Sequence, residues 1–328
     1  MLDREELLKL IDEKYKSNGE NPDVYLSGLL NAKAITYWDY IQVDALLGLQ
    51  IQRTTAPDEM VFIMYHQINE LLFKMILWEI DQVSTSETIS PEKFTMHLDR
   101  VSRYFDLLSN SFNIMQKGME VEQYMKFRDT LTPASGFQSA QYRKIEFAST
   151  DLLNLIDFRF RATIDRNTPW EFAFDNMYWQ AAGVRPEGKS ALLSNFEERY
   201  KTELIETMKS YNTTNLLAKY LSLPEAERNN LELINAMRHY DHTVNIRWVM
   251  NHFNAARHYI ESGKGSGEAT GGSDWQKYML PRYQKRIFFP ELWSDNELDN
   301  WGIDNLEGYK PLTDISELTN KKFKGWQK

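Results

Sequence analysis

Two histidines, a tyrosine and an arginine are the residues whose types and spacing could serve either chemistry or packing. His66 lies within the mostly apolar stretch 58–83, one helical turn after Phe62, and a titratable imidazole is uncommon in such a position. It is either a core histidine that hydrogen-bonds to a neighbour or a group that faces a bound ligand. Only the rest of the sequence can separate these two interpretations.

His252 lies in the segment WVMNHFNAARHY, where the residues one helical turn away include Trp248, Ala255 and Ala256. Small residues next to a histidine allow a flat ring system to approach the helix backbone. A single imidazole ligand would also leave one face of a haem iron open to oxygen. A histidine that only packs in the core is the alternative, but histidine-ligated haem is the metal site that this composition favours.

Tyr124 and Arg128 are four residues apart on a predicted helix and therefore share one face. An arginine beside an aromatic hydroxyl can bind a carboxylate through two parallel hydrogen bonds, and an amino-acid substrate carries such a carboxylate. The alternative is a surface arginine that pairs with Asp129 or Glu122.

The remaining histidines form no recognisable metal motif. His239 and His242 are three apart and could share a helix face, but Arg238 and Asp241 stand beside them, so we expect both rings to be solvated or ion-paired. His97 has polar neighbours and carries no separate signal. Neither the Glu-x-x-His pattern of di-iron bundles nor a His-Glu-x-x-His pattern occurs.

A glycine-rich segment, SGKGSGEATGGS, covers residues 262–273. It is not a P-loop, because His258 occupies the position of the required first glycine, and Glu268 likewise breaks a G-x-G-x-x-G pattern. We therefore exclude nucleotide binding and expect a flexible loop that closes over a ligand.

Apolar periodicity and capping signals predict helices almost throughout. Asp3 followed by Glu6 forms a capping box, and Pro57 with two acidic residues behind it starts the helix that holds His66. Ser90 and Pro91 start the next helix in the same way. A long segment with helical periodicity runs from 226 to 262 and ends at Gly263.

The predicted fold is all-α. No strand pairs joined by tight turns appear, so a sheet is at most a minor feature. We expect a single helical domain, residues 1–328, that encloses a haem pocket, with a small helical appendage at about 165–224, where periodicity weakens.

Composition narrows the functional class further. The 328 residues carry a net charge of −9 with no basic stripe, which argues against nucleic acid as a partner. The absence of cysteine excludes disulfides, thiolate metal sites and covalently attached haem. No signal peptide or apolar run long enough to cross a membrane is present, so we expect a soluble, cytoplasmic protein.

Taken together, six blocks resemble the tryptophan 2,3-dioxygenase family: YWDYIQVDALLGLQ, DEMVFIMYHQINELLFK, YMKFRDTLTPASGFQSAQYRKIEF, RWVMNH, ATGGS and FFPELW. The resemblance is collinear from about Ile35 to Trp293. It implies an all-helical homotetramer that binds haem b, with ferrous iron in its active state. It further implies an oxidoreductase of the kynurenine pathway of tryptophan catabolism, which inserts both atoms of O2 across the indole C2–C3 bond to give N-formylkynurenine.

The resemblance also implies roles for individual residues. His252 falls at the position of the axial haem iron ligand and His66 at the histidine that faces the bound gas and the indole N–H. Phe62 falls at the aromatic residue that packs on the indole. Arg128 takes the place of the arginine that holds the substrate carboxylate, with Tyr124 one turn before it.

Five further positions are implied to contribute. Thr270 matches a threonine that closes over the amino-acid end of the substrate. Tyr37 and Tyr40 match tyrosines that reach into the pocket of a neighbouring subunit. Ser135 and Gly136 align with the segment beside the haem propionates.

The sequence departs from the family pattern at Leu72, at Pro57 and in a longer stretch between His252 and Thr270. Because that stretch touches substrate in the family, a substituted tryptophan remains an alternative substrate. Mono-oxygenation of an indole, hydroxylation of a tyrosine-like substrate and a non-catalytic haem sensor are alternative functions. For His66 we favour a hydrogen-bonding and positioning role over proton abstraction.

Overall fold

A computed structural model of the chain describes residues 2–128, 139–185, 188–260, 279–304 and 306–318. It divides the chain into two compact units, Met1–Ile51 and Gln52–Lys328, and each is treated by itself. The predicted all-α fold is confirmed: in these ranges the only strands are two short ones, β1 (Val184–Arg185) and β2 (Gly188–Lys189), which pair antiparallel.

The α-helices of the two units have the following bounds. The first unit contains α1 (Arg4–Ser17), α2 (Pro22–Asn31), α3 (Tyr37–Ile41) and α4 (Val43–Leu47). The second unit contains α5 (Asp58–Ser84), α6 (Pro91–Lys117), α7 (Val121–Arg128), α8 (Ala140–Ser149), α9 (Trp170–Asp175), α10 (Ala191–Tyr211), α11 (Leu216–Ser222), α12 (Glu225–Arg228), α13 (Leu231–His242), α14 (Trp248–Ile260), α16 (Pro281–Gln284) and α17 (Asp295–Asp299).

Several tighter or wider helical turns complete the second unit. The 3-10 turns are η3 (Leu152–Leu155), η4 (Tyr178–Gly183), η6 (Pro290–Leu292) and η7 (Ile315–Leu318), and η5 (Thr243–Arg247) is a π-helical turn.

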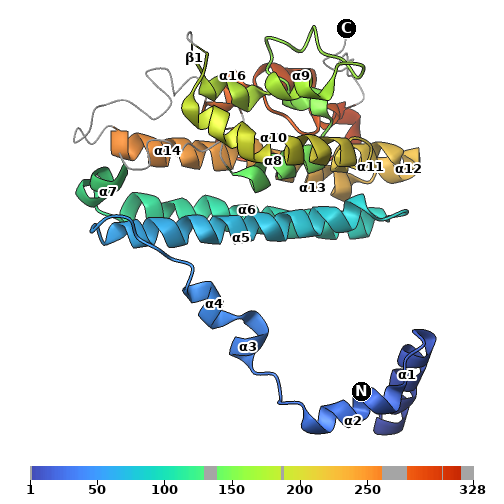
Figure 1. Ribbon diagram of the computed structural model, residues 1–328. Helices are drawn as coiled ribbons and strands as arrows, with labels where there is room; N and C mark the ends of the chain where they lie inside the picture. The colour runs from blue at the N-terminus through green and yellow to red at the C-terminus, as the bar shows by residue number, and fades with distance from the viewer. Residues whose placement is uncertain (1, 129–138, 186–187, 261–278, 305, 319–328) are drawn as a thin grey trace. The chain divides into compact units, whose positions relative to one another are not determined.

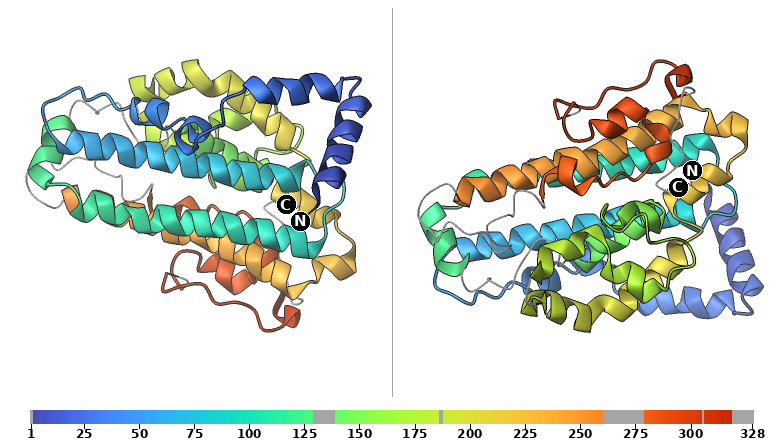
Figure 2. Two further views of the ribbon diagram at one scale, coloured as in Figure 1. Left: turned by 90° about the horizontal axis from the view of Figure 1, so that it is seen from below. Right: turned by 90° about the horizontal axis from the view of Figure 1, so that it is seen from above.

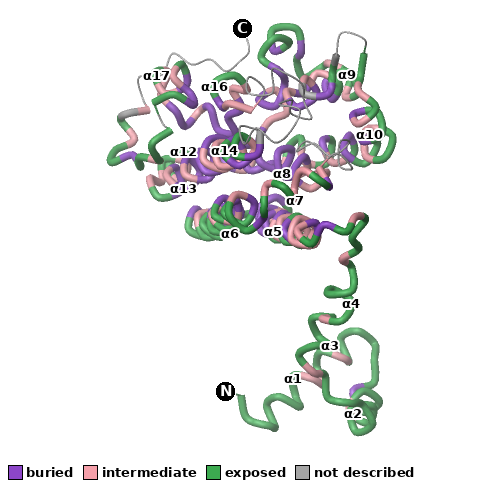
Figure 3. The backbone as a smooth tube through the Cα atoms, turned by 90° about the vertical axis from the view of Figure 1, so that its left-hand side faces the viewer, coloured by how far each residue is buried: buried purple, intermediate pink, exposed green. Residues whose placement is uncertain are grey.

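The first unit begins with the capping box that the sequence predicts. The Asp3 carboxylate accepts the backbone N–H of Glu6 at 2.9 Å, and the Glu6 carboxylate accepts that of Asp3 at 3.2 Å. Large apolar side chains of this unit are exposed, Leu30, Tyr37 and Tyr40 among them. Figure 3 accordingly colours nearly the whole of the first unit as exposed.

The framework of the second unit is a pair of long helices. α5 and α6 each have 27 residues, run antiparallel and form one layer (Figure 1). The Ser90 hydroxyl caps α6 ahead of Pro91, and acidic residues fill the first turn of α5, as the sequence predicts.

A second layer packs on this pair and buries the main core. α13 and α14 lie along α6, whereas α8 packs on α5 and on α10 (Figure 2). The core includes Ile76, Phe94, Phe105, Tyr240 and Phe288, each of which is fully buried. Burial of such side chains is the main stabilising contribution to a helical layer structure.

The described residues between 165 and 224 include α9, η4, the paired strands β1 and β2, α10 and α11. Side chains of α10 and α11, such as Phe196, Leu204 and Leu217, belong to the main core cluster. The division of the chain into a helical domain with an appendage here stays a prediction. In the described ranges no helix combines the length and the apolarity that crossing a membrane requires.

The periodic segment from 226 to 262 is helical over most of its described length, as expected. It contains the end of α12 and then α13, η5 and α14, which follow one another without a break, and η5 is a wider turn that was not expected. The apolar pattern passes unbroken through Val244, Ile246 and Val249, so the sequence gives no sign of the wider turn.

Candidate functional site

His66 and Phe62 lie one turn apart on α5 and contact each other directly. The His66 Nδ1 atom is 2.8 Å from the Phe62 carbonyl oxygen, and the two rings are 4.1 Å apart. A carbonyl oxygen only accepts, so Nδ1 carries the proton and Nε2 is left as an acceptor.

The His66 ring is reached by solvent and yet poorly solvated. Burial among protein atoms lowers its pKa, although the bond to Phe62 and the charge of Glu70 oppose that effect. The side chain as a whole nevertheless remains accessible to solvent. The imidazole is therefore neutral near pH 7 and open to a second molecule.

His252 faces the same region from α14. Its ring stacks on Phe112 of α6, with ring centres 5.6 Å apart and planes inclined by 17°, and it contacts Trp248 at 5.7 Å. Burial lowers the pKa of His252 to about 4, and the nearby charge of a protonated His66 contributes in the same direction. The two imidazoles, which come from different helices, are therefore close enough to interact electrostatically.

Neither ring nitrogen of His252 makes a hydrogen bond to another residue in the described part of the chain. A neutral imidazole with a free nitrogen lone pair is the form that ligates a metal. Ala255, one turn later, is buried.

The aromatic partners of both histidines, Phe62 and Phe112, belong to a second, smaller hydrophobic cluster beside the main core. It joins α5, α6, α7 and α14, and its members are Ala56, Tyr65, Phe112, Met115, Met119, Phe127, Ala255 and Tyr259, with Val61, Phe62, Val121, Tyr124 and Trp248 at its edge. Figure 1 shows α7 across the end of the α5–α6 layer, beside the end of α14. The cluster therefore supplies an aromatic, apolar lining.

Tyr124 and Arg128 come from α7, on one face as predicted. Burial raises the pKa of Tyr124, whereas the charge of Arg128 and its hydrogen bond to the Tyr124 hydroxyl lower it. The Tyr124 ring is 6.1 Å from that of Phe62 and 4.2 Å from that of Tyr259. The pair thus lies next to the aromatic residue that precedes His66.

Two reciprocal hydrogen bonds fix α7 against the start of α5. The Asp58 N–H donates to Gln123 at 3.1 Å, and the Glu120 N–H donates to the Asp58 carboxylate at 2.7 Å. Asp58 is the first residue of α5, so these bonds set the distance between Arg128 and the His66 turn.

Phe62, His66, Tyr124, Arg128 and His252 are therefore brought together at one end of the second unit. Ser135, Gly136 and Thr270, three other predicted site residues, lie outside the described residues. Tyr37 and Tyr40 belong to the first unit, where both are exposed.

Two of the other histidines are buried, so the expectation of a solvated His242 is wrong. His242, expected to be solvated or ion-paired, is buried, and its ring lies 6.1 Å from that of Tyr309. His97, which carried no signal, is buried and lies 2.7 Å from the Glu79 carboxylate. The described residues contain no group of three or more His, Cys, Asp or Glu side chains placed to hold a metal ion.

Sequence reasoning also missed a buried ionic network behind the site. The Glu146 carboxylate lies among Arg143, Arg286 and Tyr178, and all three side chains contact it. Arg143 and Glu146 are three apart in the motif QYRKIEF, a spacing that predicts an ion pair on a helix, but Arg286 lies 140 residues from Glu146.

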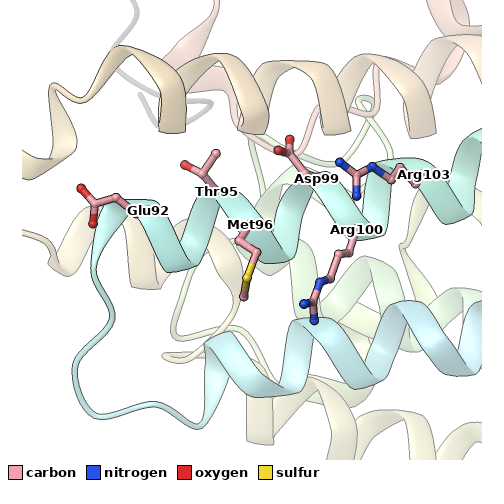
Figure 4. Close-up of a pocket in the computed structure, with 6 residues that line it drawn as sticks. All are labelled: Glu92, Thr95, Met96, Asp99, Arg100 and Arg103. Carbon is pink, nitrogen blue, oxygen red and sulfur yellow. The ribbon is translucent and has the colours of Figure 1, made fainter.

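A hollow of about 350 Å³ lies elsewhere, over the exposed side of α6 (Figure 4). Its lining residues are Glu92, Thr95, Met96, Asp99, Arg100 and Arg103. Arg100 points toward α5 and approaches Glu79 at 3.5 Å. None of the predicted site residues lines this hollow.

The comparisons with known proteins agree with one another. A family model described as tryptophan 2,3-dioxygenase matches residues 27–199, a range that includes Phe62, His66, Tyr124 and Arg128. The tryptophan 2,3-dioxygenase of Ruegeria sp. (strain TM1040) is 31% identical over 282 residues, which cover 80% of this chain and 92% of that protein. The tryptophan 2,3-dioxygenase of Bradyrhizobium diazoefficiens is 28% identical, with 80% and 92% covered. That of Bacillus cereus is also 28% identical, with 79% and 91% covered.

Proposed function

The chain belongs to the tryptophan 2,3-dioxygenase family, and we propose that it inserts both atoms of O2 across the indole C2–C3 bond of L-tryptophan to give N-formylkynurenine. The observation that carries this proposal is the pairing of two neutral imidazoles, His66 from α5 and His252 from α14, in one aromatic environment.

His252 would hold a haem b through its free ring nitrogen. The residues around it fit such a group, because the imidazole is neutral, its neighbours are aromatic and the residue one turn later, Ala255, has a small side chain. Ser135 and Gly136 would lie beside the propionates. When bound, the haem supplies a ferrous iron that activates oxygen.

His66 would orient the indole. With its proton on Nδ1 and donated to the Phe62 carbonyl, Nε2 is available to accept the indole N–H. A lowered pKa keeps the ring in this neutral, accepting form at pH 7. Its role is thus positioning by hydrogen bond, and the Phe62 ring would pack on the indole.

Arg128 would bind the substrate carboxylate, with the Tyr124 hydroxyl as a second donor. The contact between these two side chains holds the guanidinium toward the aromatic cluster, where a charge pair is less screened than at the surface. Thr270 would close over the same end of the substrate and exclude water.

We further propose a cytoplasmic homotetramer in which Tyr37 and Tyr40 enter the site of a neighbouring subunit. Two apolar surfaces support self-association: the exposed side chains of the first unit and a stripe along α5. The stripe has heptad spacing and consists of Met64, Ile68, Leu71, Met75 and Trp78, all exposed.

Turnover of L-tryptophan under 18O2, followed by mass spectrometry, tests the reaction. The proposal predicts a product that gains two labelled oxygen atoms. A gain of one label would mean mono-oxygenation. A tryptophan-induced change in the ferrous Soret band without any oxygenated product would mean a haem sensor.

A further inference from the structure

The turn that precedes the proposed haem ligand is not α-helical. η5 is a single π-helical turn, Thr243–Arg247, between α13 and α14, and it ends five residues before His252. Wider turns of this kind are rare, and inside α-helices they occur mostly at functional sites.

A π turn takes up one extra residue and so rotates every later side chain about the helix axis. From Tyr240 to His252 is twelve residues, which in a regular α-helix is a rotation of about 1,200°, or about 120° away from the face of Tyr240. With one residue absorbed by the turn, the rotation is about 1,100°, which leaves His252 about 20° from that face.

The observed contacts agree with the smaller angle of about 20°, in which His252 and Tyr240 lie on nearly the same helix face. Tyr240 contacts Phe105 of α6, with ring centres 5.9 Å apart, and His252 stacks on Phe112 of the same helix. Phe105 and Phe112 are seven residues apart and therefore lie on one face of α6. Without the π turn, His252 would point away from α6 and from the aromatic cluster.

Asn245, in the middle of the turn, is held at both ends of its side-chain amide. Its nitrogen donates to Asp241 at 2.6 Å, and its oxygen accepts from the Nε atom of Arg286. The Arg286 guanidinium also lies 3.4 Å from the carbonyl oxygen of Val244, inside the turn.

Both partners of Asn245 are themselves fixed. Asp241 accepts the backbone N–H groups of Phe288 and Phe289 at 2.9 Å each and the indole N–H of Trp293 at 3.0 Å. The Arg286 guanidinium donates to Tyr142 at 2.8 Å and contacts Glu146. A buried ion pair of this kind contributes little net stability, whereas it can select one conformation over others.

We propose that Arg286, acting through Asn245, holds the π turn and thereby sets the rotation of α14 that directs His252 toward the aromatic cluster. Arg286 is a positioning residue, since it reaches the ligand only through the helix. The link to haem rests on the proposed function, whereas the link between Arg286 and the turn does not.

Arg286→Lys is the informative variant, because it keeps the charge next to Glu146 but loses the planar group that reaches both Asn245 and Val244. Arg143→Lys is a matched control. Arg143 is as buried as Arg286 and contacts the Glu146 carboxylate at 3.1 Å, but it does not contact the turn. The substitution is the same chemical change. Asn245→Ala is a second, uncharged test of the same contact.

Two readouts separate the parts of the proposal. Amide hydrogen exchange of haem-free protein should be at least about tenfold faster over residues 243–252 in Arg286→Lys and Asn245→Ala, with no change there in Arg143→Lys. The hemin dissociation constant should rise at least about tenfold in the first two variants only, with a shifted iron–histidine band in the resonance Raman spectrum of the ferrous state.

Exchange and hemin affinity that match Arg143→Lys in both test variants would overturn the proposal. Faster exchange with wild-type hemin affinity and an unshifted band would overturn the link between the turn and His252. Wild-type protein that binds no hemin would contradict the proposed function and that same link, while the exchange data would still decide whether Arg286 holds the turn.

Discussion

The His66 Nδ1 atom donates to the carbonyl oxygen of Phe62 over 2.8 Å, within one turn of α5. This local bond fixes the tautomer of a histidine that solvent can reach, and it leaves Nε2 as the only acceptor of the ring. The chemistry assigned to His66 follows from that one contact.

Replacement of His66 by Ala should remove the acceptor for the indole N–H. We expect the transition-state stabilisation measured by kcat/KM for L-tryptophan to fall by about 1–3 kcal/mol. This is the usual effect of one unsatisfied buried hydrogen bond. For 1-methyltryptophan, which has no N–H to donate, the loss should be much smaller. Steady-state kinetics with both substrates checks this, with His239→Ala, a histidine that stacks on Tyr309 away from the aromatic cluster, as the control. Equal losses for the two substrates would show that His66 does not accept a hydrogen bond from the indole N–H.

Replacement of Arg128 by Gln should weaken the binding of the substrate carboxylate. We expect an effect of about 2–5 kcal/mol, because a buried partner charge would be left unpaired. Tryptamine lacks the carboxylate, so the wild-type preference for tryptophan over tryptamine should disappear in the variant. Tyr124→Phe should show the same trend with a smaller loss. A preference that survives in Arg128→Gln would place the carboxylate elsewhere.

The start of α5 should be sensitive to acid through Glu59. This carboxylate is buried and accepts the backbone N–H groups of Arg53 and Thr54 at 3.0 and 2.7 Å. Burial alone would raise the pKa of Glu59, but hydrogen bonds from the Thr54 hydroxyl and these two N–H groups outweigh it and lower the pKa.

A lowered carboxylate pKa stabilises the fold above the pKa of the unfolded chain and ceases to do so as pH falls through the folded value. Glu59→Gln should therefore reduce the free energy of unfolding by about 1–3 kcal/mol at pH 7, and the difference from wild type should shrink below about pH 4.5. Urea unfolding across this pH range measures both. Glu87→Gln, in an exposed loop, should change stability by less than about 0.5 kcal/mol. A difference that stays constant with pH would exclude the ionised carboxylate as its cause.

Tyr37 and Tyr40 should act on a neighbouring subunit. A chain with both tyrosines changed to Ala and a chain with Arg128→Ala should each be nearly inactive when expressed alone. Co-expression should restore about a quarter of the wild-type sites, because random assembly pairs an intact Arg128 with an intact neighbour at that frequency. Mixed oligomers without activity would show that all of these residues serve the site of their own chain.

Local signals in the sequence predicted most of the framework. The caps at Asp3 and Ser90 and the proline at Pro57 mark helix starts that the structure has, because a cap involves residues only a few positions apart. The placement of His66 beside Phe62 follows in the same way from spacing along one helix.

Contacts between distant residues could not be predicted in this way. His242 was expected to be solvated or ion-paired because of its polar neighbours. It is buried, because Arg238 pairs with Glu297, 59 residues later, and both Arg238 and Asp241 are buried. The π turn depends on Arg286, 41 residues after Asn245, so no local pattern marks it.

The central claim is that the His252 imidazole holds the haem, and titration of hemin into haem-free protein tests it most directly. The wild-type chain should bind one hemin and give a Soret band of the histidine-ligated form, whereas His252→Gly should bind weakly and recover that band when imidazole is added. Wild-type affinity and an unchanged spectrum in His252→Gly, without imidazole, would contradict the account.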